Sequence, residues 1–78
     1  MLRAYNRSSV RPTLLAFSRR LREVRLSKGI SQETLARRAN VRRTFISRTE
    51  RGIGNPTLAA IAVLARGLGC DVTELFTE

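Results

Sequence analysis

The chain has 78 residues, a net charge of +9, a single cysteine and no histidine. This length allows one domain, and Cys70 alone can form neither an intrachain disulfide nor a multi-cysteine zinc site. Six scattered carboxylates without histidine argue against an enzyme, so we expect no catalytic residues, no metal and no cofactor.

Positive charge is concentrated in the middle of the chain. Residues 37–51 contain six arginines and one glutamate, whereas residues 52–78 contain one arginine and three carboxylates. All but one of the basic residues are arginine, whose planar guanidinium fits phosphate and guanine edges better than an ammonium does. An arginine preference in a GC-rich genome explains this composition equally well, so composition alone does not identify the partner.

The first two predicted elements along the chain are a basic segment and a helix. Residues 1–12 read as a flexible N-terminal arm, and residues 13–78 as the folded domain. The first helix is predicted from about Pro12 or Thr13 to Lys28, where Gly29 can end it. One apolar stripe recurs along it at helical spacing, made of Leu14, Phe17, Leu21 and Val24.

Two short helices follow. Ser31 is placed to cap a helix that ends near Ala39, and Asn40 suits a left-handed turn after it. The next helix is predicted over residues 42–51 and ends at Gly52. Apart from Ile46, with Phe45 or Thr49, its surface is polar and rich in arginine. Such a helix gains little from burial inside its own domain.

The last two predicted helices are apolar. Thr57 can cap a helix over residues 58–68, with Gly69 after its end. Asp71 and Glu74 have capping-box spacing for a short fifth helix that carries Val72, Leu75 and Phe76. No strand pattern is present, so the predicted class is all-α with five helices.

The second and third predicted helices, with the tight turn between them, form a helix-turn-helix unit. In such a unit the second helix enters the major groove of DNA, which is about as wide as a helix. A polar, cationic second helix fits this role.

The stretches LREVRLSKGISQETLA, VRRTFISRTERG and NPTLAAIAVLARGLGCDVTELF also resemble the Cro and lambda-type repressor family, most closely the restriction–modification controller proteins. This resemblance covers residues 18–76. It implies a five-helix lambda-repressor-like domain that binds double-stranded DNA through its helix-turn-helix.

The resemblance also implies roles for individual residues. Base contacts fall on Arg43, Thr44, Ser47 and Arg48. Phosphate contacts fall on Gln32, Arg42, Arg51 and Asn55. A structural ion pair joins Arg25 to Glu50. Each residue has a plainer alternative, since arginines, hydroxyls and a first-turn glutamine also occur on ordinary solvated helices, and Arg25 need not pair with Glu50.

The predicted helix at 58–68 is apolar on every side, and a helix of this kind is normally covered on every side. Since a domain this small covers one side, the other side predicts self-association. The candidate dimer interface consists of Ala59, Val63, Leu75 and Phe76. Small alanines that tolerate water are the alternative explanation.

These observations predict a homodimeric regulator of transcription, acting in the cytoplasm on a palindromic operator, with neither a membrane nor a small-molecule ligand as partner. No predicted segment is left for a sensing or catalytic domain. The alternative is an antitoxin-like or adaptor module whose basic face binds an acidic protein.

Overall fold

The computed structural model describes residues 7–77, and within this range all regular structure is helical. It contains α1 (Arg7–Ser27), α2 (Gln32–Ala39), α3 (Arg43–Glu50), α4 (Leu58–Leu68) and the 3-10 helix η1 (Val72–Phe76). The all-α prediction is confirmed. Among the helices that these residues form, none has the length and apolar character needed to cross a membrane.

The prediction of five α-helices is wrong, because the described part of the chain has four and a 3-10 helix. The fifth segment begins as predicted, with Asp71 and Glu74 forming a reciprocal capping box. Its first backbone bond runs from the Glu74 amide to the Asp71 carbonyl over three residues, at 3.0 Å. A five-residue segment is too short to form many α-helical hydrogen bonds, which join residues four apart. It therefore keeps the tighter 3-10 form, whose bonds join residues three apart.

The predicted start of the first helix is also wrong. Residues 7–12 were expected to belong to a flexible arm, but they form the first turns of α1, and Pro12 lies inside the helix. Residues 1–6 of the predicted arm lie outside the described residues. Proline at position 12 removes the bond to the carbonyl of Ser8. Because Ser8 and Pro12 are both exposed, water can bond that carbonyl and the helix continues.

The other helix ends agree with the sequence. The Ser31 hydroxyl accepts a hydrogen bond from the Thr34 amide at 3.0 Å, and the Thr57 hydroxyl accepts one from the Ala60 amide at 3.0 Å. Asn40 ends α2 in the left-handed conformation, with φ 56°, and Gly69 ends α4 with φ 71°. These caps fix where the polar α3 begins relative to its neighbours.

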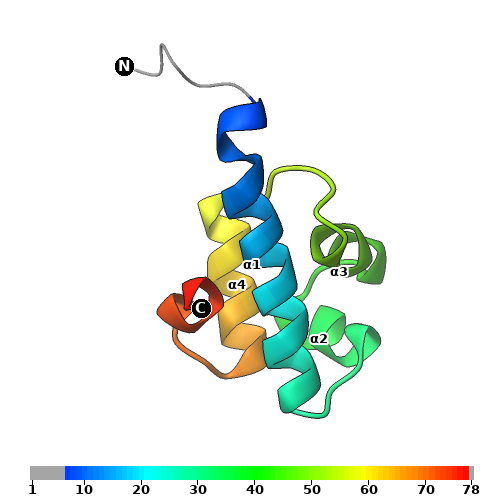
Figure 1. The fold of residues 1–78 in the computed structure, drawn as a ribbon. Helices are drawn as coiled ribbons and strands as arrows, with labels where there is room; N and C mark the ends of the chain where they lie inside the picture. Colours follow the sequence, from blue (N-terminus) through cyan, green and yellow to red (C-terminus); the bar gives the residue numbers. More distant parts are fainter. Residues whose placement is uncertain (1–6, 78) are drawn as a thin grey trace.

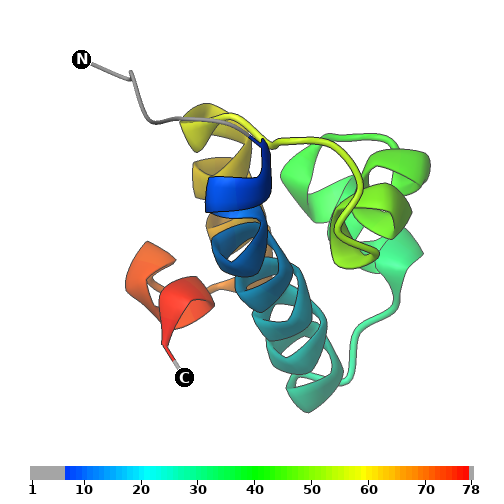
Figure 2. The same ribbon diagram turned by 45° about the horizontal axis from the view of Figure 1, so that its top comes forward.

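The long α1 separates two groups of elements. Figures 1 and 2 show α2 and α3 on one side of it and η1 on the other. Helix α2 packs against α3 and α4, while η1 packs against α1 and α4. Every element contributes to one core, whose fully buried large side chains are Leu21, Leu35, Ile46, Leu64 and Leu75.

Gly67 has a packing role that its sequence context did not reveal. From the sequence, this glycine only weakens the last turn of α4, by up to ~1 kcal/mol relative to alanine. In the structure, a Cβ at position 67 would lie 3.0 Å from Leu35 Cδ1 and 3.2 Å from Ala39 Cβ. The missing side chain therefore allows α2 to approach α4 closely.

Candidate nucleic-acid interface

Helices α2 and α3 are joined by a tight turn. The Val41 amide donates to the Ala36 carbonyl at 2.9 Å, which closes the end of α2. Arg42 is extended and forms the N-cap position of α3, without a side-chain cap. The two helices with this turn form the helix-turn-helix unit that the sequence predicted.

The outer side of α3 is polar and exposed. Arg42, Arg43, Thr44, Arg48 and Arg51 are exposed, and Ser47 is half-buried. At 3.6 residues per turn, Thr44, Arg48 and Arg51 lie about 140–160° around the helix from the buried Ile46. Ser47 lies about 100° from Ile46, and Arg43, about 60° from it, lies at the edge of the outer side. Within residues 7–77, neither Arg43 nor Arg48 forms an ion pair. The helix thus presents hydrogen-bond donors that can bind bases or phosphates.

The inner side of α3 is anchored by two buried residues. The Ile46 side chain is fully buried in the core. Thr49 is also buried, and its hydroxyl donates to the Phe45 carbonyl at 2.7 Å. The buried hydroxyl of Thr49 is therefore paired within α3.

Arg25 and Glu50 form a buried ion pair between α1 and α3, as the resemblance implied. Arg25 Nε and Glu50 Oε2 lie 2.6 Å apart, and Arg25 Nη2 donates to Glu50 Oε1 at 3.0 Å. The remaining terminal nitrogen, Nη1, donates to the Ile30 carbonyl at 2.9 Å. The hydrogen bond that Arg25 donates to Glu50 raises the pKa of Arg25 above its ordinary value, so the guanidinium stays charged.

Gln32 has a partner that the sequence did not indicate. Its side-chain amide donates to Glu50 Oε1 at 3.1 Å, which joins the first residue of α2 to the last residue of α3. Residues 32 and 50 are 18 apart, so no local helical spacing signals this bond. Its expected phosphate contact stays a prediction, and such a contact would have to share or replace the bond to Glu50.

The loop after α3 carries the remaining predicted phosphate contacts. Gly52 is buried with φ 75°, a left-handed conformation that favours glycine. Arg51 is exposed, and its Nε donates to the Ser47 carbonyl at 3.3 Å. Asn55 is exposed farther along the loop. Arg51 thus lies directly at the end of α3, and Asn55 follows it four residues later in the same loop.

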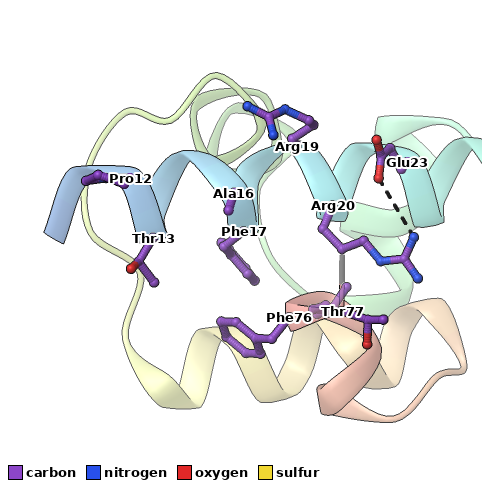
Figure 3. A pocket seen from close by; sticks show the side chains of 10 residues that line it. Pro12, Thr13, Ala16, Phe17, Arg19, Arg20, Glu23, Phe76 and Thr77 are labelled. Atoms are coloured by element: carbon purple, nitrogen blue, oxygen red, sulfur yellow. Dashed lines mark ion pairs between the residues drawn. The ribbon is translucent and has the colours of Figure 1, made fainter.

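The predicted dimer patch does not form one surface. Leu75 is fully buried in the core, because η1 turns it inward against the other helices, so it cannot form part of an exposed interface. Phe76 is half-exposed and stacks on Phe17, with ring centroids 5.4 Å apart, in a groove beside α1 (Figure 3). Ala59 and Val63 line a different hollow, which also includes Val41 and Arg38.

Comparison with known proteins identifies the same unit. The helix-turn-helix family model matches residues 21–75. The control protein C.BamHI of Bacillus amyloliquefaciens is 40% identical over 62 residues, which cover 78% of this chain and 76% of that protein. The control protein C.SmaI of Serratia marcescens is 36% identical over 58 residues, covering 74% of this chain and 69% of that protein.

A solved structure shows the same fold. The crystal structure of the restriction-modification controller protein C.AhdI from Aeromonas hydrophila superposes with a TM-score of 0.80 at 43% identity. The match covers 83% of this chain and 98% of that chain. The similarity to this controller protein, in both sequence and fold, therefore extends over most of the described residues.

Proposed function

This chain belongs to the helix-turn-helix family of DNA-binding transcriptional regulators, and we propose that it acts as a homodimer on a palindromic operator. The main support for this proposal is that α3 has an anchored inner side and an exposed, arginine-rich outer side. Its inner side is held by Ile46 and by the buried Arg25–Glu50 pair, and its outer side leaves arginines free for DNA. The controller proteins among its relatives support a restriction–modification controller role, within a lambda-repressor-like domain.

In this proposal, residues of α3 read the operator. Arg43 and Arg48 donate to base edges, and Thr44 and Ser47 supply shorter-range contacts from the same side. Each bidentate arginine–guanine pair would contribute ~1–3 kcal/mol of discrimination. The phosphate contacts are proposed for Gln32, Arg42, Arg51 and Asn55.

Selection of bound duplexes from a random pool tests base reading. Wild-type protein should enrich a palindromic sequence, and Arg43→Ala should lose preference at two symmetric positions. Arg43→Lys keeps the charge but lacks the planar fork, so it should also relax these positions while the salt dependence of binding stays unchanged. An Arg43→Ala variant with wild-type preferences would show that this residue does not read bases.

A titration with random duplex DNA at low salt tests DNA binding itself. A DNA-binding protein of this charge should bind random duplexes weakly, with an affinity that falls steeply as salt rises. No binding even at low salt would contradict the proposal and favour the basic adaptor module instead.

The dimer is proposed to form through α4. Ala59 and Ala62 are exposed, and Val63 is half-buried at the same outer side of the helix, so this small apolar surface can cover its counterpart in a second copy. Two recognition helices would then meet half-sites about one helical turn, ~34 Å, apart.

Sedimentation of charge-introducing variants tests this interface. Val63→Glu should yield monomers, whereas Thr73→Glu, on the exposed part of η1, should leave the dimer intact. A dimer that persists in Val63→Glu and separates in Phe76→Ala would place the interface in the groove between α1 and η1.

A further inference from the structure

A row of α1 side chains runs beside the loop that follows α3. A Cβ placed on Gly52 would lie 2.7 Å from Leu15 Cδ2 and 3.8 Å from Ser18 Oγ, so both side chains are next to this loop. Figures 1 and 2 both show the loop passing beside the N-terminal half of α1. This part of α1 is thus adjacent to the end of the recognition helix.

Two arginines continue the same row. Arg11 lies four residues before Leu15, and Arg22 lies four residues after Ser18, which places all four on one face of the helix. Both arginines are exposed. Arg22 also precedes Arg25 by three residues, and Arg25 bonds directly to Glu50 at the end of α3. The row therefore follows α3 and its loop along one side.

The charges on this face are uncompensated. Among the described residues, Arg11 and Arg22 form no ion pair. The only carboxylate of α1, Glu23, lies beside Arg20 instead, with Arg20 Nη1 and Glu23 Oε1 3.8 Å apart. Arg11 and Arg22 are exposed at the two ends of this row, and Arg51 is exposed at the end of α3, so three cationic side chains are available around the loop.

We propose that Arg11 and Arg22 bind phosphates of the operator DNA, which extends the DNA contact surface along α1 beyond the loop. This inference rests on the proposed function, in which Arg51 and Asn55 meet the same DNA backbone. Contact with phosphate rather than bases follows from the position of α1, since α3 and not α1 enters the groove. Arg11 lies before the segment that the family model matches, residues 21–75. The contact at Arg11 would therefore lie outside the part of the chain that the family model matches.

The salt dependence of operator binding tests the proposal. The double variant R11Q/R22Q should bind the selected operator about twofold to fivefold more weakly for each arginine that is replaced. The slope of log affinity against log salt should fall by ~0.9 for each phosphate contact. The selected base sequence should not change, because phosphates carry no base identity.

Lys28→Gln is the matched control. Its ammonium is exposed beyond the C-terminal end of α1, close enough to Cys70 to oppose the rise in the pKa of that thiol that burial causes. It removes a positive charge without touching the proposed surface, so its salt slope should stay close to wild type. R11K/R22K should recover the wild-type salt slope that the double glutamine variant loses, because an ammonium also neutralises a phosphate.

The outcomes separate this inference from the proposed function. If wild-type protein selects an operator but R11Q/R22Q has the affinity and slope of Lys28→Gln, the α1 contacts are wrong and the function stands. If wild-type protein binds no duplex, both are wrong. Thermal unfolding of each variant should match wild type, since the substituted side chains are exposed.

Discussion

The two sides of α3 use charged side chains in opposite ways. On the inner side, Glu50 is buried and bonded to Arg25 at 2.6 Å, and it also accepts a bond from Gln32. On the outer side, Arg43 and Arg48 are exposed and form no ion pair within residues 7–77. The same residue type, arginine, thus serves as a structural anchor on one side and as a free donor on the other.

This difference shows how a polar helix can be rigidly placed without a large apolar face. Only Ile46 contributes a fully buried apolar side chain from α3. A buried ion pair is weak evidence for net stability, because desolvation offsets much of the attraction. Its fork geometry does fix direction, so the Arg25–Glu50 pair sets the rotation at which the outer arginines face DNA.

The largest expected effect is the loss of the buried partner. Glu50→Ala leaves the Arg25 guanidinium buried without a carboxylate, which should lower the free energy of unfolding by ~3–5 kcal/mol. Urea unfolding measures this. Glu50→Gln keeps a hydrogen-bond acceptor, so it should lower the free energy of unfolding by less than Glu50→Ala does. A Glu50→Ala protein as stable as wild type would remove the distinction between the two sides of α3.

Arg48→Ala should show the converse behaviour on the outer side. Since Arg48 is exposed and bonded to no carboxylate within residues 7–77, its loss should change the free energy of unfolding by less than ~0.5 kcal/mol. Operator affinity should fall by ~1–3 kcal/mol, if the side chain forms a bidentate base contact. Urea unfolding and operator binding of the same preparation test this. A large loss of stability would assign Arg48 an anchoring role.

Gly67→Ala tests the packing behind the helix-turn-helix unit. An alanine at an exposed helical position would stabilise α4 by up to ~1 kcal/mol relative to glycine. Here its Cβ would meet Leu35 and Ala39 of α2, and overpacking of this kind costs ~1–3 kcal/mol. We therefore expect a net loss of about 1 kcal/mol in urea unfolding. A gain would show that α2 moves away from α4 without cost.

The opposite substitution at an exposed position of α1, outside the proposed dimer surface, is the control. Ala16→Gly changes helix propensity where the side chain is exposed, so it should lose up to ~1 kcal/mol with little packing contribution. The two substitutions have opposite effects on propensity. Equal losses would therefore mean that packing dominates at Gly67.

The sequence predicted the caps and most helix ends because their signals are local. Ser31, Asn40 and Thr57 act on residues within one turn of themselves, and the structure confirms each. The start of α1 was missed because proline is also a signal for a helix start. The fifth helix was assigned to the wrong type because its apolar residues and capping box suit either helical form.

The features that depend on contacts between distant residues were harder to predict. The Arg25–Glu50 pair came from family resemblance, whereas the Gln32–Glu50 bond and the close approach at Gly67 had no local signal. Leu75 was predicted as surface because its covering helices are far away in sequence. The exposed face of α3 could be predicted, since a helix whose only large apolar residues are the adjacent Phe45 and Ile46 has to leave its other side in solvent.

A second arginine–glutamate pair on α1 provides the smallest effect. Arg20 Nη1 and Glu23 Oε1 lie 3.8 Å apart, and 57% of the Glu23 side chain is exposed, against 3% for Glu50 (Figure 3). Water competes for such a pair, so Glu23→Gln should change the free energy of unfolding by ~0–0.5 kcal/mol. The bond from Arg20 Nε to the Glu74 carbonyl, at 2.7 Å, stays intact and keeps η1 in place.

Any effect of Glu23→Gln should shrink further at high salt, which does not screen the buried pair to the same extent. A loss near that of Glu50→Ala would mean that burial does not separate the two pairs, and the anchoring role assigned to Arg25 would lose its physical basis.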